Sequence, residues 1–329
     1  MIDQIRADTS IDVAYRGVPA LVLGGSGFIG AWTIRALHAR GAAVTAAARD
    51  ADRASAAIGP LGRDVRVLVD DLEDPRAPGR LVDMAAPAIV FNLAGYGVDR
   101  SERSAASMTA LNACMVETLC AKLAAQPGRA WPGLRLVHVG SALEYGRLEG
   151  SLSETVQANP TTDYGRTKLQ GTRAVESCCA ASGLSAVVAR LFTVYGPGEH
   201  SDRLLPALMR TARTGIRLPL TSGRQRRSFT YVEDVAEGLL RLGVSGARPG
   251  AIVNLATGSV LPVREFAETA AAVLGIDPAL LDFGALPDRE DEMWHGDVDV
   301  TRLRSLTSWM PSTSIAEGIR RTWESINVP

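Results

Sequence analysis

Three glycines at three-residue spacing separate a short apolar run from a helical pattern. The run is Ala20 to Leu23, the glycines are Gly24, Gly27 and Gly30, and Ile29 to Arg40 has helical periodicity. Such glycines allow a tight turn, a close approach of backbone to a pyrophosphate, and close packing of helix on strand. The start of the helix then offers free amides to phosphate groups. The pattern predicts a strand–turn–helix unit that binds a dinucleotide, in preference to a purely structural turn.

Further short apolar runs follow along the chain, and segments of helical length separate them. Strands are expected at residues 43–48, 65–69, 88–93, 134–139 and 187–191. Alternation of this kind indicates a parallel sheet with helices on both faces. We predict an α/β fold, namely a Rossmann-type doubly wound parallel sheet with a smaller α/β C-terminal substrate domain.

The pattern changes after Arg190, where turn signals such as Gly196-Pro197-Gly198 and shorter elements appear. A chain of 329 residues is long enough for one large and one smaller domain. We expect a dinucleotide-binding domain over residues 18–190, to which 229–242 returns. Residues 191–329 are then mainly substrate-binding, and residues 1–17 form an N-terminal extension.

Composition narrows the class of protein. The formal net charge is −1, so nucleic acid and acidic membranes are not expected as partners. The N-terminus lacks the apolar region of a signal peptide, and no run of apolar residues is long enough to span a bilayer. The four cysteines show neither paired metal spacing nor a disulfide framework. We therefore expect a soluble cytoplasmic protein without a metal site.

The end of the second expected strand bears on the choice of cofactor. An acidic residue there would accept hydrogen bonds from the adenosine ribose, whereas an arginine would accommodate a 2'-phosphate. The strand ends near Ala48, which is followed by Arg49 and Asp50. Arg49 favours NADP, while Asp50 keeps NAD possible because it lies near the spacing of the ribose-binding acid.

Tyr164 and Lys168 lie four residues apart at the start of a helical segment, which places both side chains on one face. A neighbouring ammonium favours the phenolate and would lower the pKa of the tyrosine from about 10. Such a tyrosine can pass a proton to or from a substrate oxygen while a hydride moves. Ser141, at the end of the fifth expected strand, can donate to the same oxygen. The serine favours a catalytic group over a surface tyrosine–lysine pair.

These residues belong to a longer series of motifs that resembles the extended short-chain dehydrogenases/reductases. The motifs are Gly24 to Gly30, Asp71-Leu72, Asn92 to Gly95, Ser141 with Tyr145-Gly146, Tyr164 with Lys168, Arg190 to Phe192, Val194 to Gly198, and Arg227 to Val235. The resemblance runs from about residue 18 to the C-terminus, and the order of the motifs agrees with the family. Its members include NAD(P)-dependent nucleotide-sugar epimerases, dehydratases and ketoreductases.

The resemblance implies roles for individual residues. Ser141, Tyr164 and Lys168 would be catalytic, and Asn112 would support the lysine through water. Arg227 would grip the diphosphate of the substrate, Arg289 would be a second arginine near the nucleotide, and Thr193 would also face the substrate. The implied cofactor contacts are Gly24, Gly27, Phe28, Ile29, Gly30, Arg49, Asp71, Leu72, Leu93, Ala94 and Gly95, with Asp71 on the adenine.

Three departures from the family pattern bear on the reaction. The 4,6-dehydratases carry Asp-Glu directly after the catalytic hydroxyl residue, where this chain has Ala142 and Leu143, which cannot perform acid/base elimination. Thr193 replaces an asparagine of many sugar-nucleotide members, and Glu144 replaces a valine.

The sequence leaves several functions open. We expect an NADPH-dependent reductase of a nucleotide-linked 4-keto (deoxy)sugar, with a nucleotide-diphosphate sugar as its partner molecule. The alternatives are an NAD-dependent 4-epimerase, a reductase of a carbonyl outside sugars, and a non-catalytic dinucleotide-sensing regulator. A homodimer is expected, because the helices near residues 106–125 and 164–181 are rich in small residues and the equivalent family helices form a four-helix interface.

Overall fold

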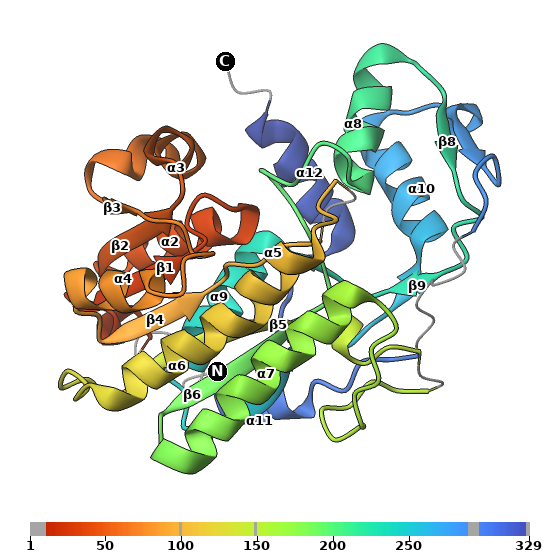
Figure 1. Cartoon of the computed structure of the whole chain (residues 1–329). Helices are drawn as coiled ribbons and strands as arrows, with labels where there is room; N and C mark the ends of the chain where they lie inside the picture. Colours follow the sequence, from red (N-terminus) through yellow and green to blue (C-terminus); the bar gives the residue numbers. More distant parts are fainter. Residues whose placement is uncertain (1–10, 99–100, 148–149, 289–295, 327–329) are drawn as a thin grey trace.

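The computed structural model describes residues 11–98, 101–147, 150–288 and 296–326, and its centre is a seven-stranded parallel sheet (Figure 1). The strand order is β11-β6-β5-β4-β1-β2-β3. The strands are β1 (Pro19–Leu23), β2 (Ala43–Ala48), β3 (Arg66–Val69), β4 (Ile89–Asn92), β5 (Leu136–Ser141), β6 (Ala186–Leu191) and β11 (Ala251–Leu255). The expected Rossmann-type sheet is thereby confirmed.

The sheet is buried on both faces, which explains why its strands read as apolar runs rather than alternating ones. Every residue of β4 and β6 is buried. The strand order reverses between β1 and β4, so the crevice for a ligand lies beyond the carboxyl ends of these two strands. The predicted site residues after β1, β4 and β5 all belong to this edge.

Helices cover the two faces and form two hydrophobic cores with the sheet. One face carries α2 (Phe28–Ala39), α3 (Ala51–Ile58), α9 (Val232–Gly243) and α11 (Thr301–Thr307), with the 3-10 turn η1 (Gly59–Arg63) after α3. The other face carries α4 (Ala77–Ala85), α5 (Ala105–Thr109), the π-helical turn η2 (Ala110–Cys114), α6 (Met115–Ala125) and α7 (Asp163–Ser182). Helices α6 and α7 run side by side across this face (Figure 1).

A smaller layer beyond the carboxyl edge of the sheet has its own core. Phe229 and Phe266 stack at its centre with ring centroids 4.1 Å apart. Its helices are α8 (Leu204–Thr214), α10 (Val263–Leu274) and α12 (Ile315–Ser325). Its strand pairs are β7 (Thr193–Tyr195) with β10 (Phe229–Tyr231), β9 (Arg226–Arg227) with β12 (Leu261–Pro262), and β8 (Leu218–Leu220) with β13 (Leu281–Phe283). Two 3-10 turns, η3 (Ala142–Glu144) and η4 (Pro278–Leu280), complete the elements.

The chain passes between the sheet and the smaller layer more than once. After β10, helix α9 packs against α2, and β11 pairs in parallel with β6. The division into a dinucleotide-binding and a substrate domain remains a proposal, with α9 and β11 assigned to the former. Of the N-terminal extension, residues 11–17 are described, and Tyr15 is buried there with its hydroxyl donating to the carbonyl of Leu240 at 2.7 Å. Within the described ranges, none of the helices combines the length and the apolarity that a membrane span requires.

Candidate active site

The glycine turn forms a cradle between β1 and α2. Gly24 has φ +78°, and a Cβ on it would lie 2.8 Å from the backbone nitrogen of Ala94. A Cβ on Gly30 would overlap the Gly24 carbonyl oxygen. Helix α2 begins at Phe28 with Gly27 as N-cap, and neither a capping side chain nor an acidic first-turn residue is found among the described residues there. These residues therefore fit a dinucleotide, because the first-turn amides and the positive helix end are available to its phosphates.

The loop after β4 connects this cradle to the predicted catalytic residues. Leu93 donates its N–H to the Leu23 carbonyl at 3.0 Å, and Ala94 lies against Gly24. A Cβ on Gly95 would be 3.2 Å from Asn112 Oδ1 and 4.0 Å from Lys168 Nζ. A residue larger than glycine at position 95 would therefore crowd the Asn112 side chain.

The two residues that follow β2 differ in whether their side chains are available to contact a cofactor. The strand ends at Ala48, and the Arg49 side chain is exposed directly after it. Asp50 is the N-cap of α3, and its Oδ1 accepts the N–H groups of Asp52 at 2.8 Å and Arg53 at 3.0 Å. The Asp50 carboxylate is therefore engaged in starting the helix, whereas Arg49 has no such structural task in the described contacts.

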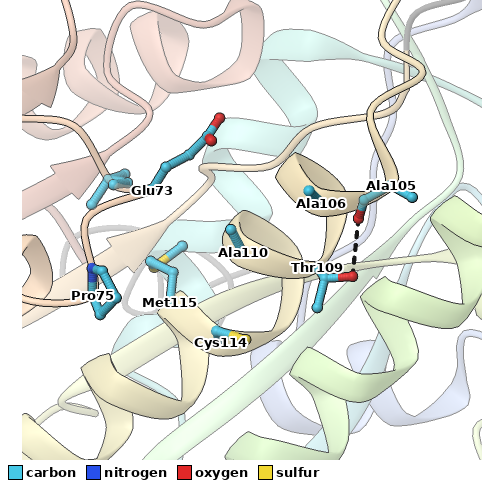
Figure 2. Close-up of a pocket in the computed structure, with 9 residues that line it drawn as sticks. Glu73, Pro75, Ala105, Ala106, Thr109, Ala110, Cys114 and Met115 are labelled. Carbon is cyan, nitrogen blue, oxygen red and sulfur yellow. Dashed lines mark hydrogen bonds between the residues drawn. The ribbon is translucent and has the colours of Figure 1, made fainter.

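A cavity of about 530 Å³ lies between the loop after β3 and the α5–η2 segment (Figure 2). Asp71 is exposed in that loop and accepts the Glu73 N–H at 3.0 Å, while Leu72 is buried and lines the cavity. The other lining residues are Glu73, Pro75, Ala105, Ala106, Thr109, Ala110, Cys114 and Met115. The cavity borders the position predicted for the adenine, and its wall is largely apolar, as suits a flat base.

The predicted catalytic side chains come together from β5 and α7. Ser141 is the last residue of β5, and Tyr164 and Lys168 lie in the first turns of α7. The N-cap Thr162 fixes the start of α7 by accepting the Gly165 N–H at 3.0 Å. Lys168 is buried, and its ammonium donates to the Val139 carbonyl at 2.6 Å.

The environment of these side chains changes their acidity. Burial raises the pKa of Tyr164 above 10, and the Glu144 carboxylate raises it further, whereas a hydrogen bond with Ser141 lowers it. The sequence predicted that Lys168 would lower the pKa of Tyr164. Burial outweighs that effect, and the phenol keeps its proton at neutral pH. Burial also lowers the pKa of Lys168 to about 8, although Glu144 opposes this by raising it.

Asn112 lies in the π-helical turn η2, a distortion often found at functional sites. Its Oδ1 accepts the Tyr96 N–H at 3.0 Å, and its Nδ2 donates to the Tyr96 carbonyl at 2.8 Å and to Thr167 Oγ1 at 3.1 Å. Asn112 thereby ties the loop after β4 to the residue next to Lys168. Its role toward the lysine remains a proposal.

The predicted substrate residues lie in the smaller layer. Thr193 begins β7, where its N–H donates to the Ser228 carbonyl at 3.0 Å. Arg227 ends β9 and pairs with Leu261 of β12. Arg289 lies outside the described residues. The structure thus brings the predicted cofactor and catalytic residues together at one edge of the sheet, and it places Thr193 and Arg227 on the neighbouring layer.

A family model described as the NAD dependent epimerase/dehydratase family matches residues 20–256. The chain belongs to this family. It is 31% identical to a dTDP-6-deoxy-L-talose 4-dehydrogenase (NAD(P)(+)) from Kitasatospora kifunensis, with 92% of this chain and 93% of that protein covered. It is 28% identical to a dTDP-glucose 4,6-dehydratase from Streptomyces niveus, with 92% of this chain and 91% of that protein covered. A solved structure of MoeE5 in complex with UDP-glucose and NAD is 28% identical, with a TM-score of 0.80 over 93% of this chain and 97% of that one.

Membership of the epimerase/dehydratase family makes the chain an NAD(P)-dependent enzyme.

The structure also contains a buried ion pair next to Ser141, which the sequence analysis did not predict. Glu144 and Arg190 are almost fully buried, and Arg190 Nε lies 2.9 Å from Glu144 Oε2. The signal in the sequence was Glu144 itself, since a carboxylate where the family usually has valine requires a buried partner.

Proposed function

We propose that this epimerase/dehydratase-family enzyme reduces the ketone of a nucleotide-linked 4-keto deoxysugar with NADPH. The proposal depends on two features of the site. Ser141, Tyr164 and Lys168 form one group, and Ala142 and Leu143 directly follow the serine in sequence. The group contains hydroxyls for a carbonyl oxygen. The two residues after the serine lack the acid and base that elimination of water requires.

The named relatives support the same distinction. The relative with 31% identity is named a 4-dehydrogenase of dTDP-6-deoxy-L-talose that uses NAD(P)(+). The relative with 28% identity is named a 4,6-dehydratase. Since Ala142 and Leu143 supply no acid or base, we infer that this chain follows the former.

The chain's own residues would act on the carbonyl oxygen. Ser141 and Tyr164 would donate hydrogen bonds to it, and these bonds strengthen as negative charge develops there. Tyr164 would then transfer its proton, which its raised pKa keeps available at neutral pH. The Lys168 ammonium would stabilise the resulting phenolate. When bound, NADPH would supply the hydride.

We propose that Arg49 selects NADPH and that Arg227 holds the substrate diphosphate. Arginine suits both tasks because its planar guanidinium binds phosphate oxygens in pairs. Exposure of Arg49 and the engagement of Asp50 in the cap of α3 support the first assignment.

We further propose that the enzyme is a cytoplasmic homodimer. The four cysteines are all free thiols, which supports the compartment. Helices α6 and α7 lie side by side on one face, which supports the dimer (Figure 1).

The assay that tests the function follows the absorbance of NADPH with a nucleotide-linked 4-keto-6-deoxy sugar. Oxidation of NADPH that depends on the sugar, with the 4-hydroxy sugar as product, supports the reductase. Interconversion of two 4-epimers with no net oxidation or reduction of cofactor would instead assign the 4-epimerase, which needs the same hydroxyl and lysine residues. Reduction of only simple ketones would move the substrate outside nucleotide sugars.

A further inference from the structure

The turn that follows Ser141 carries a buried carboxylate. Glu144 ends the 3-10 turn η3, and its side chain folds back under the catalytic serine. Its Oε1 accepts the Ser141 N–H at 2.7 Å. Its Oε2 accepts the Thr172 hydroxyl and Arg190 Nε, each at 2.9 Å. The carboxylate therefore links β5, α7 and β6 at one point.

Gly140 provides the space for this carboxylate. A Cβ on Gly140 would lie 2.6 Å from Glu144 Oε1 and 3.0 Å from Val188 Cγ1. Any larger residue would displace the carboxylate from the Ser141 N–H. Gly140 and Glu144 thus form a matched pair around the catalytic serine.

Arg190 is held in place as well as paired. Its guanidinium lies over the Tyr145 ring, 4.4 Å from the centroid. The Tyr145 hydroxyl in turn donates to Asn254 Oδ1 of β11 at 2.7 Å. The ion pair is consequently anchored to β11 through Tyr145 and Asn254.

The carboxylate acts electrostatically on both titrating catalytic side chains. It raises the pKa of Tyr164 and also that of Lys168, and so favours the protonated form of each. The other groups facing these two side chains are Ser141, Glu102 and Arg203 around Tyr164, and His138 near Lys168. Of these, Glu102 also raises the pKa of Tyr164, whereas Ser141 and Arg203 lower it.

We propose that Glu144 is a positioning residue for the catalytic group. Its carboxylate fixes Ser141 on β5 by accepting the Ser141 N–H. Its negative charge adds to the effect of burial in favouring the protonated form of Tyr164. This inference rests on the proposed function only in so far as Ser141, Tyr164 and Lys168 form the catalytic group. It holds for a reductase and for an epimerase alike.

The first test needs no substrate. Ionisation of Tyr164 is followed by the ultraviolet absorbance of tyrosinate, as the difference between each protein and its Tyr164→Phe counterpart. Glu144→Gln keeps the size of the side chain and an oxygen for the Ser141 N–H, but removes the charge. In this variant Tyr164 should lose its proton at a lower pH than in the wild type, because the charge that opposes formation of the phenolate is gone. An unchanged Tyr164 titration overturns the proposal, whatever reaction the enzyme catalyses.

A matched control removes a different carboxylate near the site. Glu154 Oε1 accepts the Asn254 N–H at 2.8 Å, so Glu154→Gln loses the same charge from a neighbouring structural hydrogen bond. Its Tyr164 titration should equal that of the wild type. A shift in Glu154→Gln as large as that in Glu144→Gln would show a general effect of charge and overturn the specific role.

A second variant covers the case in which Glu144→Gln does not fold, since it leaves Arg190 without its anionic partner. The double variant Glu144→Val with Arg190→Met replaces the buried pair by apolar side chains, which proteins often tolerate. The titration of Tyr164 should shift in the same downward direction. Circular dichroism and quenching of tryptophan fluorescence by cofactor confirm that each variant is folded and binds.

Kinetics give the remaining readout. With a substrate that the wild type turns over, Glu144→Gln should lower kcat by ~10-fold or more and leave KM nearly unchanged, because the neutral amide no longer forms the ion pair with Arg190 that anchors the turn after Ser141. Thr172→Val keeps the carboxylate and removes one of its hydrogen bonds, so its effect should be smaller. An equal loss in both variants would indicate a purely structural role. A wild type without activity toward ketosugars would count against the reductase assignment alone.

Discussion

The Lys168 ammonium donates a 2.6 Å hydrogen bond to the carbonyl oxygen of Val139, two residues before Ser141. The lysine of α7 is thus attached directly to the strand that ends in Ser141, the predicted catalytic serine. Because Lys168 is buried, this contact holds its charge beside the carboxyl end of β5.

Removal of the Tyr164 hydroxyl should abolish proton donation and little else. We expect Tyr164→Phe to lower kcat by ~10²-fold or more, because only the transferable proton is lost, with little change in KM. Steady-state rates with the ketosugar provide the measurement. Cofactor affinity, measured by fluorescence, should stay near the wild-type value. A kcat close to that of the wild type would require another proton donor.

Arg49 should determine the preference for NADPH. We expect Arg49→Ala to raise KM for NADPH by ~10-fold or more, because a hydrogen bond to a charged group contributes ~1.5–3 kcal/mol. KM for NADH should change little. The matched control is Arg53→Ala on α3, another exposed arginine a few residues along. Faster turnover of the wild type with NADH than with NADPH would contradict the role of Arg49.

Arg227 should act on substrate binding rather than on chemistry. Arg227→Ala is expected to raise KM for the nucleotide sugar by ~10-fold or more with a much smaller loss of kcat, because the diphosphate contact is present before and during reaction. Arg217→Ala serves as the control, since Arg217 pairs with Asp282 at 3.3 Å on an exposed surface. An unchanged KM would point to Arg224 or Arg226 as the diphosphate ligand.

The helices α6 and α7 should form the interface of a homodimer. Light scattering at micromolar concentration should give twice the mass of the chain. Ala121 is exposed on α6, so Ala121→Arg should produce a monomer, whereas Ala272→Arg on the exposed face of α10 should not. A monomeric wild type would exclude this interface.

His138 should make the stability of the enzyme sensitive to mild acid. It is fully buried in β5, where its Nδ1 lies 3.1 Å from Asn92 Nδ2, and burial holds its pKa well below 6.5. Between that value and the unfolded pKa of about 6.5, only the unfolded chain binds the proton, so stability falls as the pH falls, by at most ~1.4 kcal/mol per unit.

Denaturant unfolding between pH 7 and pH 5 measures this effect. His138→Gln should lose less stability over the interval than the wild type. His200→Gln, on an exposed loop, should lose as much as the wild type. Identical pH dependence in His138→Gln and the wild type would show that other groups account for the loss.

Local patterns determined the parts of this protein that depend on neighbours in sequence. The glycine spacing predicted the cradle, because at Gly24 and Gly30 a side chain would collide with backbone atoms of the turn and its neighbour. Likewise, Tyr164 and Lys168 share a helix face by virtue of their four-residue spacing. The parallel sheet followed from apolar runs that alternate with helical segments.

Contacts between distant segments were decided only by the tertiary structure. The Glu144 carboxylate meets Arg190 and Thr172 through β5, β6 and α7, and no local pattern encodes that meeting. The direction of the Tyr164 pKa also depended on burial, which a spacing of four residues does not report. The return of β11 to the sheet is of the same kind, because parallel pairing with β6 joins strands that the smaller layer separates in sequence. Sequence specifies which side chains are available locally, whereas desolvation and long-range charge arise only when the chain is packed.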